Sequence, residues 1–294
     1  MPESQRSRKV TRALLRNFPL PDPGARGDKE SRGRVLVIGG EVALPGAVIL
    51  AAIASLRAGA GKLQIATCKS IAVQVGVAVP EAMSLGLRET KDGTIDPRSW
   101  TDLKVFASDA DAVVIGPGMT IRKTNTQLAR DVLRSTQSAV VVDAGALPVL
   151  NASPNVLKHR QGNTVVTPNE SETAALLDIS EGEVEASAPD VALELASRFN
   201  AVIALKGPTT VIATPDNRLF RYSGGDVGLG TSGSGDALAG LTAGLLARGA
   251  PPLEAALWSV YLHGAAGNRL TRKFGRIGYL ARELLAEIPA LLEA

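Results

Sequence analysis

The sequence is poor in cysteine, histidine and aromatic side chains, and each scarcity excludes a class of protein. Cys68 is the only cysteine among 294 residues, so no intrachain disulfide can form and a reducing compartment is expected. Cys68 also lacks a nearby histidine or CxxC partner, and we expect it to be buried filler rather than a nucleophile. The two histidines, His159 and His263, have no partners at metal-ligand spacing and are expected on the surface or on a helix face.

Long apolar runs and aromatic clusters are also missing. No apolar stretch reaches the length of a membrane span, and the first residues are charged where a secretory signal would need an apolar segment. Phe, Trp and Tyr make up 3% of the chain, too few to place stacking rings among basic residues in a nucleic-acid site. We therefore expect a cytoplasmic protein with no nucleic-acid and no membrane partner.

Positive charge is concentrated at the start of the chain. Residues 1–34 contain nine Lys/Arg and four Asp/Glu, a balance of +5, whereas the formal net charge of the whole chain is +3. The remainder is therefore nearly neutral. Apolar residues make up 45% of the chain and are spread over its length without a polar linker, so it can bury a large core. We expect a basic N-terminal arm over residues 1–32 and one globular domain over residues 33–294.

Apolar runs that suit buried strands alternate with helical patterns along most of the chain. The predicted strands are 35–38, 63–67, 111–115, 139–143, 164–167 and 201–205, with a hairpin over 209–214 and 218–222; the predicted helices are 46–58, 123–135, 191–199, 235–248, 253–270 and 278–292. Such alternation predicts an α/β fold built from parallel βαβ units with helices on both faces.

Polar or glycine-rich segments follow several of the predicted strands. They are Gly39-Gly40, Gly116-Pro117-Gly118, Asp143-Ala144-Gly145, Thr167-Pro168-Asn169 and Lys206-Gly207. Because ligands of such sheets bind beyond the carboxyl ends of the strands, these segments are expected to converge on one site. Asp143 could hold a hydroxyl there or form an Asx-turn, and the Gly116–Gly118 turn could expose backbone amides or be an ordinary turn.

The strongest candidate is the loop 230–236, which runs into a small-residue helical pattern. Free N–H groups and the helix dipole make a helix N-terminus an anion site, so Gly233, Ser234 and Gly235 are expected to bind phosphate. Asp236 would accept a proton from the hydroxyl that attacks phosphorus, or orient that hydroxyl. The helix terminus should favour the ionised carboxylate. The alternative is that Asp236 merely caps the helix.

Two further segments suit nucleotide chemistry. Asn169 and Glu172, three residues apart at a helix start, could hold a hydrated Mg²⁺ through water, could form a capping box, or could do both. Lys206 beside Gly207 suits nucleotide phosphates as a point charge, although an exposed lysine at a strand end is commonplace. Gly46-Ala47 leaves room for a bulky ligand, or for close helix packing.

Taken in order, these segments over residues 33–292 resemble the ribokinase-like superfamily, and within it the ADP-dependent NAD(P)H-hydrate dehydratases. The Gly235-Asp236 loop is similar to the superfamily as a whole, while two segments favour the dehydratases: Ser55-Leu56-Arg57-Ala58-Gly59-Ala60-Gly61 and Gly116-Pro117-Gly118-Met119. The resemblance implies a three-layer αβα sandwich with a mainly parallel central sheet, and a homo-oligomer, dimer or tetramer.

The resemblance also implies a reaction. ADP (or ATP), with Mg²⁺, phosphorylates the ring hydroxyl of the (6S)-hydrates of NADH and NADPH; phosphate is then eliminated, which restores the dinucleotide. By this likeness the adenine nucleotide contacts Lys206, Gly207, Pro208, Thr209, Thr210, Gly233, Ser234 and Gly235, and the hydrate contacts Ala47, Gly118, Asn169, Glu172 and Asp236. Asp236 is the implied catalytic residue.

The chain departs from the dehydratase pattern at two places. Asn169 and Ser171 stand where these enzymes usually have His and Gly in Thr-Pro-His-x-Gly-Glu, and Asp143-Ala144-Gly145 stands where many have Asp-Ala-Asp. Asn-x-x-Glu is instead typical of the superfamily's sugar and vitamin kinases. Two alternatives to the repair enzyme therefore stay open: an ATP-dependent small-molecule kinase, and a non-catalytic nucleotide-binding protein.

Overall fold

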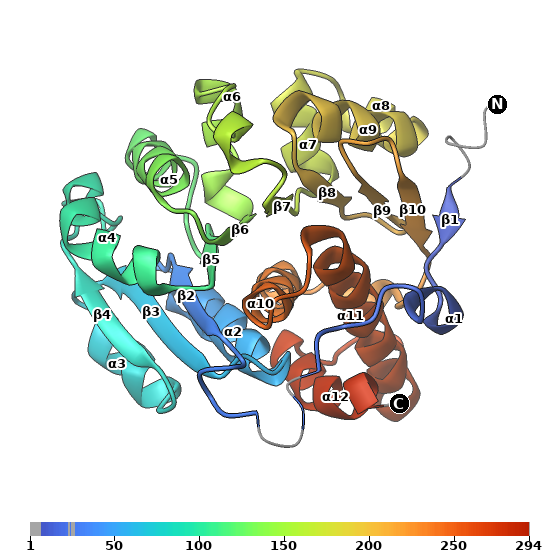
Figure 1. Ribbon diagram of the computed structural model, residues 1–294, viewed down its shortest axis with the longest axis horizontal. Helices are drawn as coiled ribbons and strands as arrows, with labels where there is room; N and C mark the ends of the chain where they lie inside the picture. The colour runs from blue at the N-terminus through green and yellow to red at the C-terminus, as the bar shows by residue number, and fades with distance from the viewer. Residues whose placement is uncertain (1–6, 23, 25–26, 294) are drawn as a thin grey trace.

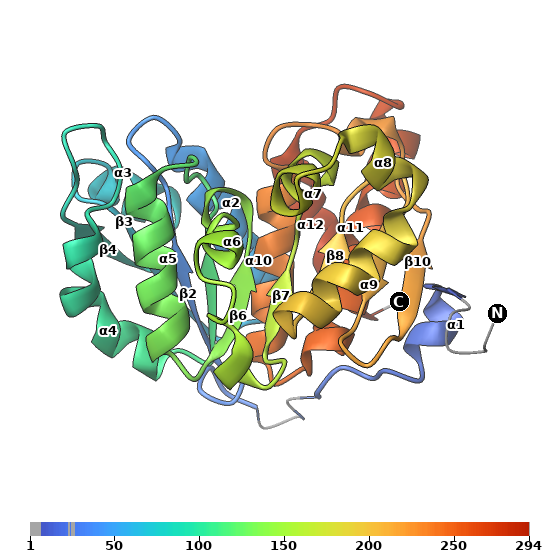
Figure 2. The ribbon, with the colours of Figure 1, turned by 90° about the horizontal axis from the view of Figure 1, so that it is seen from above.

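A mainly parallel β-sheet divides the molecule into three layers (Figures 1 and 2). The computed structural model describes residues 7–22, 24 and 27–293. Within them the sheet has ten strands in the order β1-β10-β9-β8-β7-β6-β5-β2-β3-β4. The strands are β1 (Arg8–Lys9), β2 (Arg34–Ile38), β3 (Lys62–Cys68), β4 (Met83–Leu87), β5 (Ala112–Ile115), β6 (Ala139–Val142), β7 (Thr164–Val166), β8 (Val202–Leu205), β9 (Thr210–Ala213) and β10 (Leu219–Tyr222).

The pairing of the strands follows the apolar pattern of the sequence. The central strands β5, β6, β7 and β8 are buried along their whole length, as expected where helices cover both faces. Only β9 runs antiparallel to its neighbours β8 and β10 among the described strands, so the predicted hairpin is confirmed. The edge strand β4 was not predicted, because its Met-Ser-Leu-Gly-Leu sequence is half-exposed and interrupted by glycine.

Helices cover both faces of the sheet. Figure 1 shows α4 to α9 on one face, and α2, α3, α10, α11 and α12 on the other. The helices are α1 (Arg12–Leu15), α2 (Pro45–Arg57), α3 (Ala72–Ala78), α4 (Trp100–Asp109), α5 (Lys123–Ser135), α6 (Val149–Ala152), α7 (Glu170–Leu177), α8 (Glu181–Ala186), α9 (Ala188–Phe199), α10 (Ser234–Ala247), α11 (Pro252–Phe274) and α12 (Ala281–Glu293). The expected three-layer αβα sandwich is confirmed. None of the helices described is long and apolar enough to cross a membrane.

Helix α10 lies at the centre of its layer, and its small residues explain how closely it packs. A side-chain carbon added at Gly240 would come within 3.0 Å of the Ala51 backbone on α2, and one at Gly244 would meet the Ser55 backbone. The Ser55 hydroxyl donates to the Gly240 carbonyl at 3.0 Å and so ties the two helices together. The Ala-Gly-rich stretch after Asp236 is therefore a packing surface that fixes the start of α10.

The described part of the N-terminal arm packs against the C-terminal half of the chain. β1 pairs with β10, Leu15 is fully buried, and the ring of Phe18 contacts that of Phe220 edge to face. Glu3, Arg6 and Arg26, which contribute to the predicted basic arm, lie outside the described residues. A domain boundary at residues 32 and 33 stays a prediction.

The cysteine and one of the histidines lie where the sequence predicts. Cys68 is free and buried, and burial raises the pKa of its thiol to about 11. A thiol so hard to ionise is a poor nucleophile, which confirms its role as filler. His159 is exposed on a short turn of 3₁₀ helix.

The close contact between α2 and α10 predicts the effect of adding one methyl group. Gly240→Ala should lower the free energy of unfolding by about 1–3 kcal/mol, because the backbone of Ala51 has to move. Gly182→Ala is the matched control: Gly182 is an exposed residue of α8 with open space around it, so this change should raise stability by about 0.5–1 kcal/mol. Urea unfolding measures the free energy of unfolding of both variants. An unchanged value in Gly240→Ala would contradict the close packing of α10 on α2.

Candidate active site

The loop before α10 has the backbone geometry of an anion site. Gly233 is the N-cap of the helix in a left-handed conformation with φ of 86°, and no side chain caps the helix. The N–H of Ser234 bonds to the Thr231 carbonyl at 3.2 Å, whereas no described residue accepts a hydrogen bond from the N–H of Gly235. An unpaired N–H at a helix N-terminus is suited to an anionic ligand.

A cleft of about 860 Å³ opens beside this loop. It is lined by residues from the α7 start, the β8–β9 turn, β10, the loop before α10 and α11: Asn169, Glu170, Ser171, Glu181, Lys206, Gly207, Pro208, Thr210, Tyr222, Gly224, Gly225, Asp226, Val227, Leu229, Gly230, Thr231, Ser234, Gly235, Leu238, Val260, His263, Gly264 and Arg276. Most of the residues expected to bind nucleotide thus lie on one wall. Thr209 and Gly233 do not: the Thr209 hydroxyl pairs with Ser223 at 3.0 Å, and Gly233 packs against Leu50.

Lys206 is the charged centre of the site. Its Nζ donates to Asp143 Oδ1 at 2.9 Å and lies 3.8 Å from Glu172 Oε2. A side-chain carbon placed on Gly235 would be 3.4 Å from the same nitrogen, so the ammonium also adjoins the helix start. Burial opposes its charge, but Asp143 and then Glu172 outweigh burial and raise the pKa of Lys206. Lys206 therefore stays protonated, half-buried among carboxylates rather than exposed at a strand end.

The same surroundings favour the charged form of Lys206 but the neutral form of Asp236. Burial raises the pKa of its carboxyl to about 6, with a further rise from the charge of Asp143 and an opposing effect from Lys206. The expectation that the helix terminus makes Asp236 a weaker base is therefore wrong, because desolvation and the other carboxylates outweigh the helix dipole and raise its pKa. A carboxylate that changes protonation near neutral pH is well matched to taking up a proton.

Asp143 links two parts of the site. It is almost fully buried at the end of β6, and its Oδ1 accepts from the Thr167 hydroxyl at 2.8 Å as well as from Lys206. No Asx-turn forms, since its side chain caps no backbone group of the turn that follows. A side-chain carbon at Gly116 would collide with the Asp143 carbonyl, so the Gly116–Gly118 turn lies directly against this residue.

The second part of the site lies around Gly118 and Ala47. Gly118 has φ of 67°, and a carbon placed on it would lie 3.0 Å from the Ala47 side chain and 3.1 Å from Gly40. The N–H of Gly40 donates to the Pro117 carbonyl at 2.9 Å. Two residues predicted to contact the hydrate, from α2 and from the turn after β5, are thus adjacent to each other and apart from the cleft.

Asn169 and Glu172 form the capping box at the start of α7. Asn169 Oδ1 accepts from the Glu172 N–H at 2.7 Å, and Glu172 Oε2 accepts from the Asn169 N–H at 2.8 Å. The Asn169 oxygen is therefore engaged, which leaves Glu172 Oε1 as the atom available to a cation. No group of three metal-ligating side chains occurs in the described parts of the chain.

Two residues of the site were missed by sequence reasoning. The His263 Nε2 lies 2.9 Å from the Ser234 hydroxyl, and burial lowers the pKa of the imidazole to about 4, so the ring is neutral. His263 lies on α11 and lines the cleft, as expected for a helix-face histidine. Glu41 is buried and accepts from the Thr120 N–H at 2.8 Å and from Asn125 at 2.7 Å. These three contacts join residues 29 or more positions apart, and no local pattern signals them.

The raised pKa of Asp236 predicts a change in stability with pH. Since the folded-state pKa lies near 6 and the unfolded one near 3.8, the folded protein binds the extra proton between these values. The stabilisation that this proton gives the folded protein is complete below pH 3.8 and is lost as the pH rises through about 6. Asp236→Asn cannot lose a proton and should be more stable than the parent at pH 7.5, by roughly 1–2 kcal/mol, but not at pH 4.

Urea unfolding at the two pH values measures this difference. Glu194→Gln, at an exposed position in the middle of α9, removes one carboxylate elsewhere and should shift stability little at either pH. An Asp236→Asn protein no more stable than the parent at pH 7.5 would show that the carboxyl is not desolvated as described.

Comparison with known proteins identifies the family. The chain matches the family described as NAD(P)H-hydrate dehydratase over residues 35–290. It is 46% identical over 288 residues to the ADP-dependent (S)-NAD(P)H-hydrate dehydratase of Xanthomonas campestris pv. campestris, covering 98% of this chain and 97% of that protein. It is 36% identical over 286 residues to the bifunctional NAD(P)H-hydrate repair enzyme of Moorella thermoacetica, covering 97% of this chain and 54% of that protein.

A solved structure agrees with the sequence comparison. The ADP/ATP-dependent NAD(P)H-hydrate dehydratase from Bacillus subtilis, co-crystallized with ATP and Mg²⁺, superposes with a TM-score of 0.83 at 29% identity, over 98% of each chain. A likeness of this extent covers both the cleft beside α10 and the turn after β5. The chain belongs to the NAD(P)H-hydrate dehydratase family.

Proposed function

We propose that the protein dehydrates the (S)-hydrates of NADH and NADPH at the expense of ADP, and so repairs damaged nicotinamide nucleotides. The observation that carries this proposal is the position of Asp236. Its carboxyl, with a pKa of about 6, stands beside the half-buried ammonium of Lys206 and the unpaired N–H of Gly235. Phosphoryl transfer to a hydroxyl requires a proton acceptor beside phosphate-binding groups; here the first turn of α10 and the end of β8 supply them.

The adenine nucleotide would occupy the cleft beside α10. Lys206, Gly207, Pro208 and Thr210 form one wall, while Ser234 and Gly235 bring the helix N-terminus to its phosphates. Gly233 would act through its left-handed backbone, which turns the loop into the helix. Thr209 would contribute through its backbone, because its hydroxyl is paired with Ser223.

The hydrate would bind around Ala47 and Gly118, with its ring hydroxyl toward Asp236 and its approach bordered by Asn169 and Glu172. Asp236 takes the proton of that hydroxyl while the hydroxyl oxygen attacks the terminal phosphorus of ADP. The bond from phosphorus to the bridging oxygen breaks, and AMP leaves. Loss of phosphate and of one ring proton then restores the double bond of the reduced nicotinamide.

Mg²⁺ would neutralise charge on the transferring phosphate when it is bound. It usually keeps several waters and takes one or two carboxylates besides phosphate oxygens, and the residues present fit that role. Glu172 Oε1 is free to hold the ion through water, whereas Asn169 Oδ1 is engaged in the capping box. Asn169 thus positions Glu172.

The kinase alternative rests on the Asn-x-x-Glu spacing, which forms the capping box of α7 and does not by itself distinguish a kinase from a dehydratase. The family match favours a dehydratase, and it also disfavours a non-catalytic nucleotide-binding protein. A cytoplasmic location and assembly into a dimer or tetramer remain part of the proposal.

The reaction can be followed directly by absorbance. Incubation of the protein with ADP, Mg²⁺ and hydrated NADH should restore the absorbance of reduced nicotinamide, with one AMP formed per NADH. The rate should rise as pH increases through about 6, because the ionised form of Asp236 accepts the proton. Asp236→Asn should lower kcat by about 10²–10⁴-fold while leaving adenine-nucleotide binding intact.

Two results would contradict the proposal. One is no recovery of NADH with either ADP or ATP, accompanied by phosphorylation of a sugar or vitamin alcohol from an acceptor panel. The other is an Asp236→Asn protein with undiminished turnover. The Glu194→Gln variant, altered at an exposed position on α9, serves as the activity control.

A further inference from the structure

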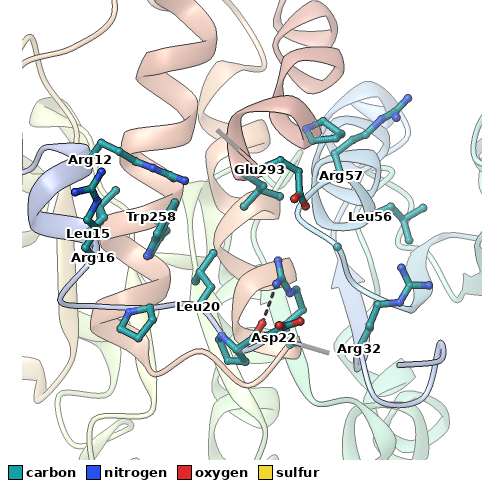
Figure 3. A pocket seen from close by; sticks show the side chains of 16 residues that line it. Arg12, Leu15, Arg16, Leu20, Asp22, Arg32, Leu56, Arg57, Trp258 and Glu293 are labelled. Atoms are coloured by element: carbon teal, nitrogen blue, oxygen red, sulfur yellow. Dashed lines mark hydrogen bonds between the residues drawn. The ribbon is translucent and has the colours of Figure 1, made fainter. Parts of the chain in front are cut away.

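A second cavity lies at the opposite end of α10 and takes no part in the mechanism above. Its volume is about 860 Å³, and it lies between α1 and the segment that follows it, the ends of α2, α10 and α12, and α11 (Figure 3). Arg248 on its wall directly follows α10, whereas Asp236 lies in the first turn of that helix. Since α10 has 14 residues, the two sites are about 20 Å apart.

Arginine dominates the charged groups of this cavity. Five arginine residues line it. Figure 3 shows Arg12 and Arg16 on one side, and Arg32 and Arg57 on the other. The five are Arg12, Arg16, Arg32, Arg57 and Arg248, against two carboxylates, Asp22 and Glu293. In the part of the chain that the structure describes, none of these five arginines forms an ion pair. The cavity therefore carries an uncompensated positive charge.

Arg12 is held in place without its full set of partners. Its guanidinium lies over the ring of Trp258 at 4.7 Å from the ring centre (Figure 3). The Trp258 Nε1 donates to the Phe18 carbonyl at 2.6 Å, so the ring itself is fixed. Yet Nη1 of Arg12 is buried and has no hydrogen-bond partner among the described residues. A buried guanidinium nitrogen without an acceptor is costly. The side chain as a whole is half-buried and lines the cavity, so its charge acts on an anion bound there.

The guanidinium of Arg248 is also held in a fixed position. It donates Nη1 to the Ala58 carbonyl and Nη2 to the Pro21 carbonyl, both at 2.9 Å, which fixes its plane at the junction of α2, α10 and the N-terminal segment. Burial lowers the pKa of this guanidinium, and the charges of Asp22 and Glu293 oppose that effect. Its charge is only partly compensated, so a ligand anion would stabilise it further.

Apolar side chains complete the wall. Leu15, Leu20, Leu56 and Leu292 line the cavity together with the Trp258 ring. A volume of this size is typical of small-molecule sites, which span roughly 300–1,000 Å³. Planar guanidiniums recognise phosphate through paired hydrogen bonds. We propose that this cavity binds a phosphate-bearing anion, either an inorganic polyphosphate or a nucleotide-sized phosphorylated metabolite, at a site separate from the catalytic one.

Trp258 offers a reporter that lines this cavity and is absent from the lining of the cleft. The chain has two tryptophans, Trp100 on α4 and Trp258, so Trp100→Phe leaves Trp258 as the sole source of tryptophan fluorescence. Titrating this variant with sodium tripolyphosphate, and separately with ATP, should give a saturable change in emission as the anion draws the Arg12 head toward itself. Tighter binding of tripolyphosphate indicates an inorganic ligand, and tighter binding of ATP indicates an organic phosphate.

Charge-removing variants assign the response to the cavity. Arg16→Ala with Arg32→Ala, in the Trp100→Phe background, removes one exposed guanidinium from each side of the cavity and should weaken binding about tenfold or more. Arg12→Met keeps an apolar stem over Trp258 and should weaken binding to a similar extent. The matched control, Lys123→Ala with Arg134→Ala, removes the same charge from exposed positions of α5 on the other face of the sheet and should leave affinity unchanged.

Two outcomes would overturn the proposal. One is a Trp258 emission that shows no saturable change with either anion up to millimolar concentration. The other is an affinity that the Arg16/Arg32 and Arg12 variants leave unchanged, or that the α5 control lowers equally. Neither outcome bears on dehydratase activity, which is assayed at the far end of α10.

Discussion

One half-buried ammonium held among three carboxyl groups is the interaction on which the site depends. Lys206 Nζ contacts Asp143 directly, lies near Glu172, and lowers the pKa of Asp236 against the effect of burial. A single cation cannot fully offset three neighbouring carboxylates, and the pKa values of both Glu172 and Asp236 are raised, that of Asp236 to about 6. Of these two groups, Asp236 lies in the first turn of α10. Its position together with its raised pKa suits it to accept a proton.

The packing of α10 makes this arrangement possible. Because Gly240 and Gly244 let α10 approach the backbone of α2 closely, the first turn of α10 is held beside α2 at the edge of the cleft. The same rigid helix carries Arg248 beyond its C-terminal end, where it enters the arginine-lined cavity. Catalytic chemistry at one end and anion recognition at the other would therefore rest on one packed element.

The sequence predicts most of the strands and helices well, because they depend on local patterns of apolar and polar residues. Buried parallel strands appear as continuous apolar runs, and the polar helix over 123–135 has the same bounds in the structure. Edge strand β4 lacks such a run, since it is half-exposed, and it was missed. The capping box of Asn169 and Glu172 was also foreseen as an alternative, since its signal is local.

The electrostatics of the site could not be predicted in the same way. The pKa of Asp236 depends on burial and on carboxylates from β6 and α7, whose distances the chain order does not reveal. The helix dipole alone predicts a lowered pKa for Asp236, and this prediction is wrong. His263 was missed as a partner of Ser234 for the same reason, because their contact arises only when α11 packs on α10.

The protonation of Asp236 itself tests this account most directly. Carbon-13 NMR of the labelled aspartate carboxyls, assigned with Asp236→Asn, gives its titration midpoint in the parent protein and in Lys206→Met. The account predicts a midpoint near pH 6 in the parent and a higher one in Lys206→Met, because the opposing charge is gone. A midpoint at or below the ordinary aspartate value of about 4, unmoved by the loss of Lys206, would contradict it.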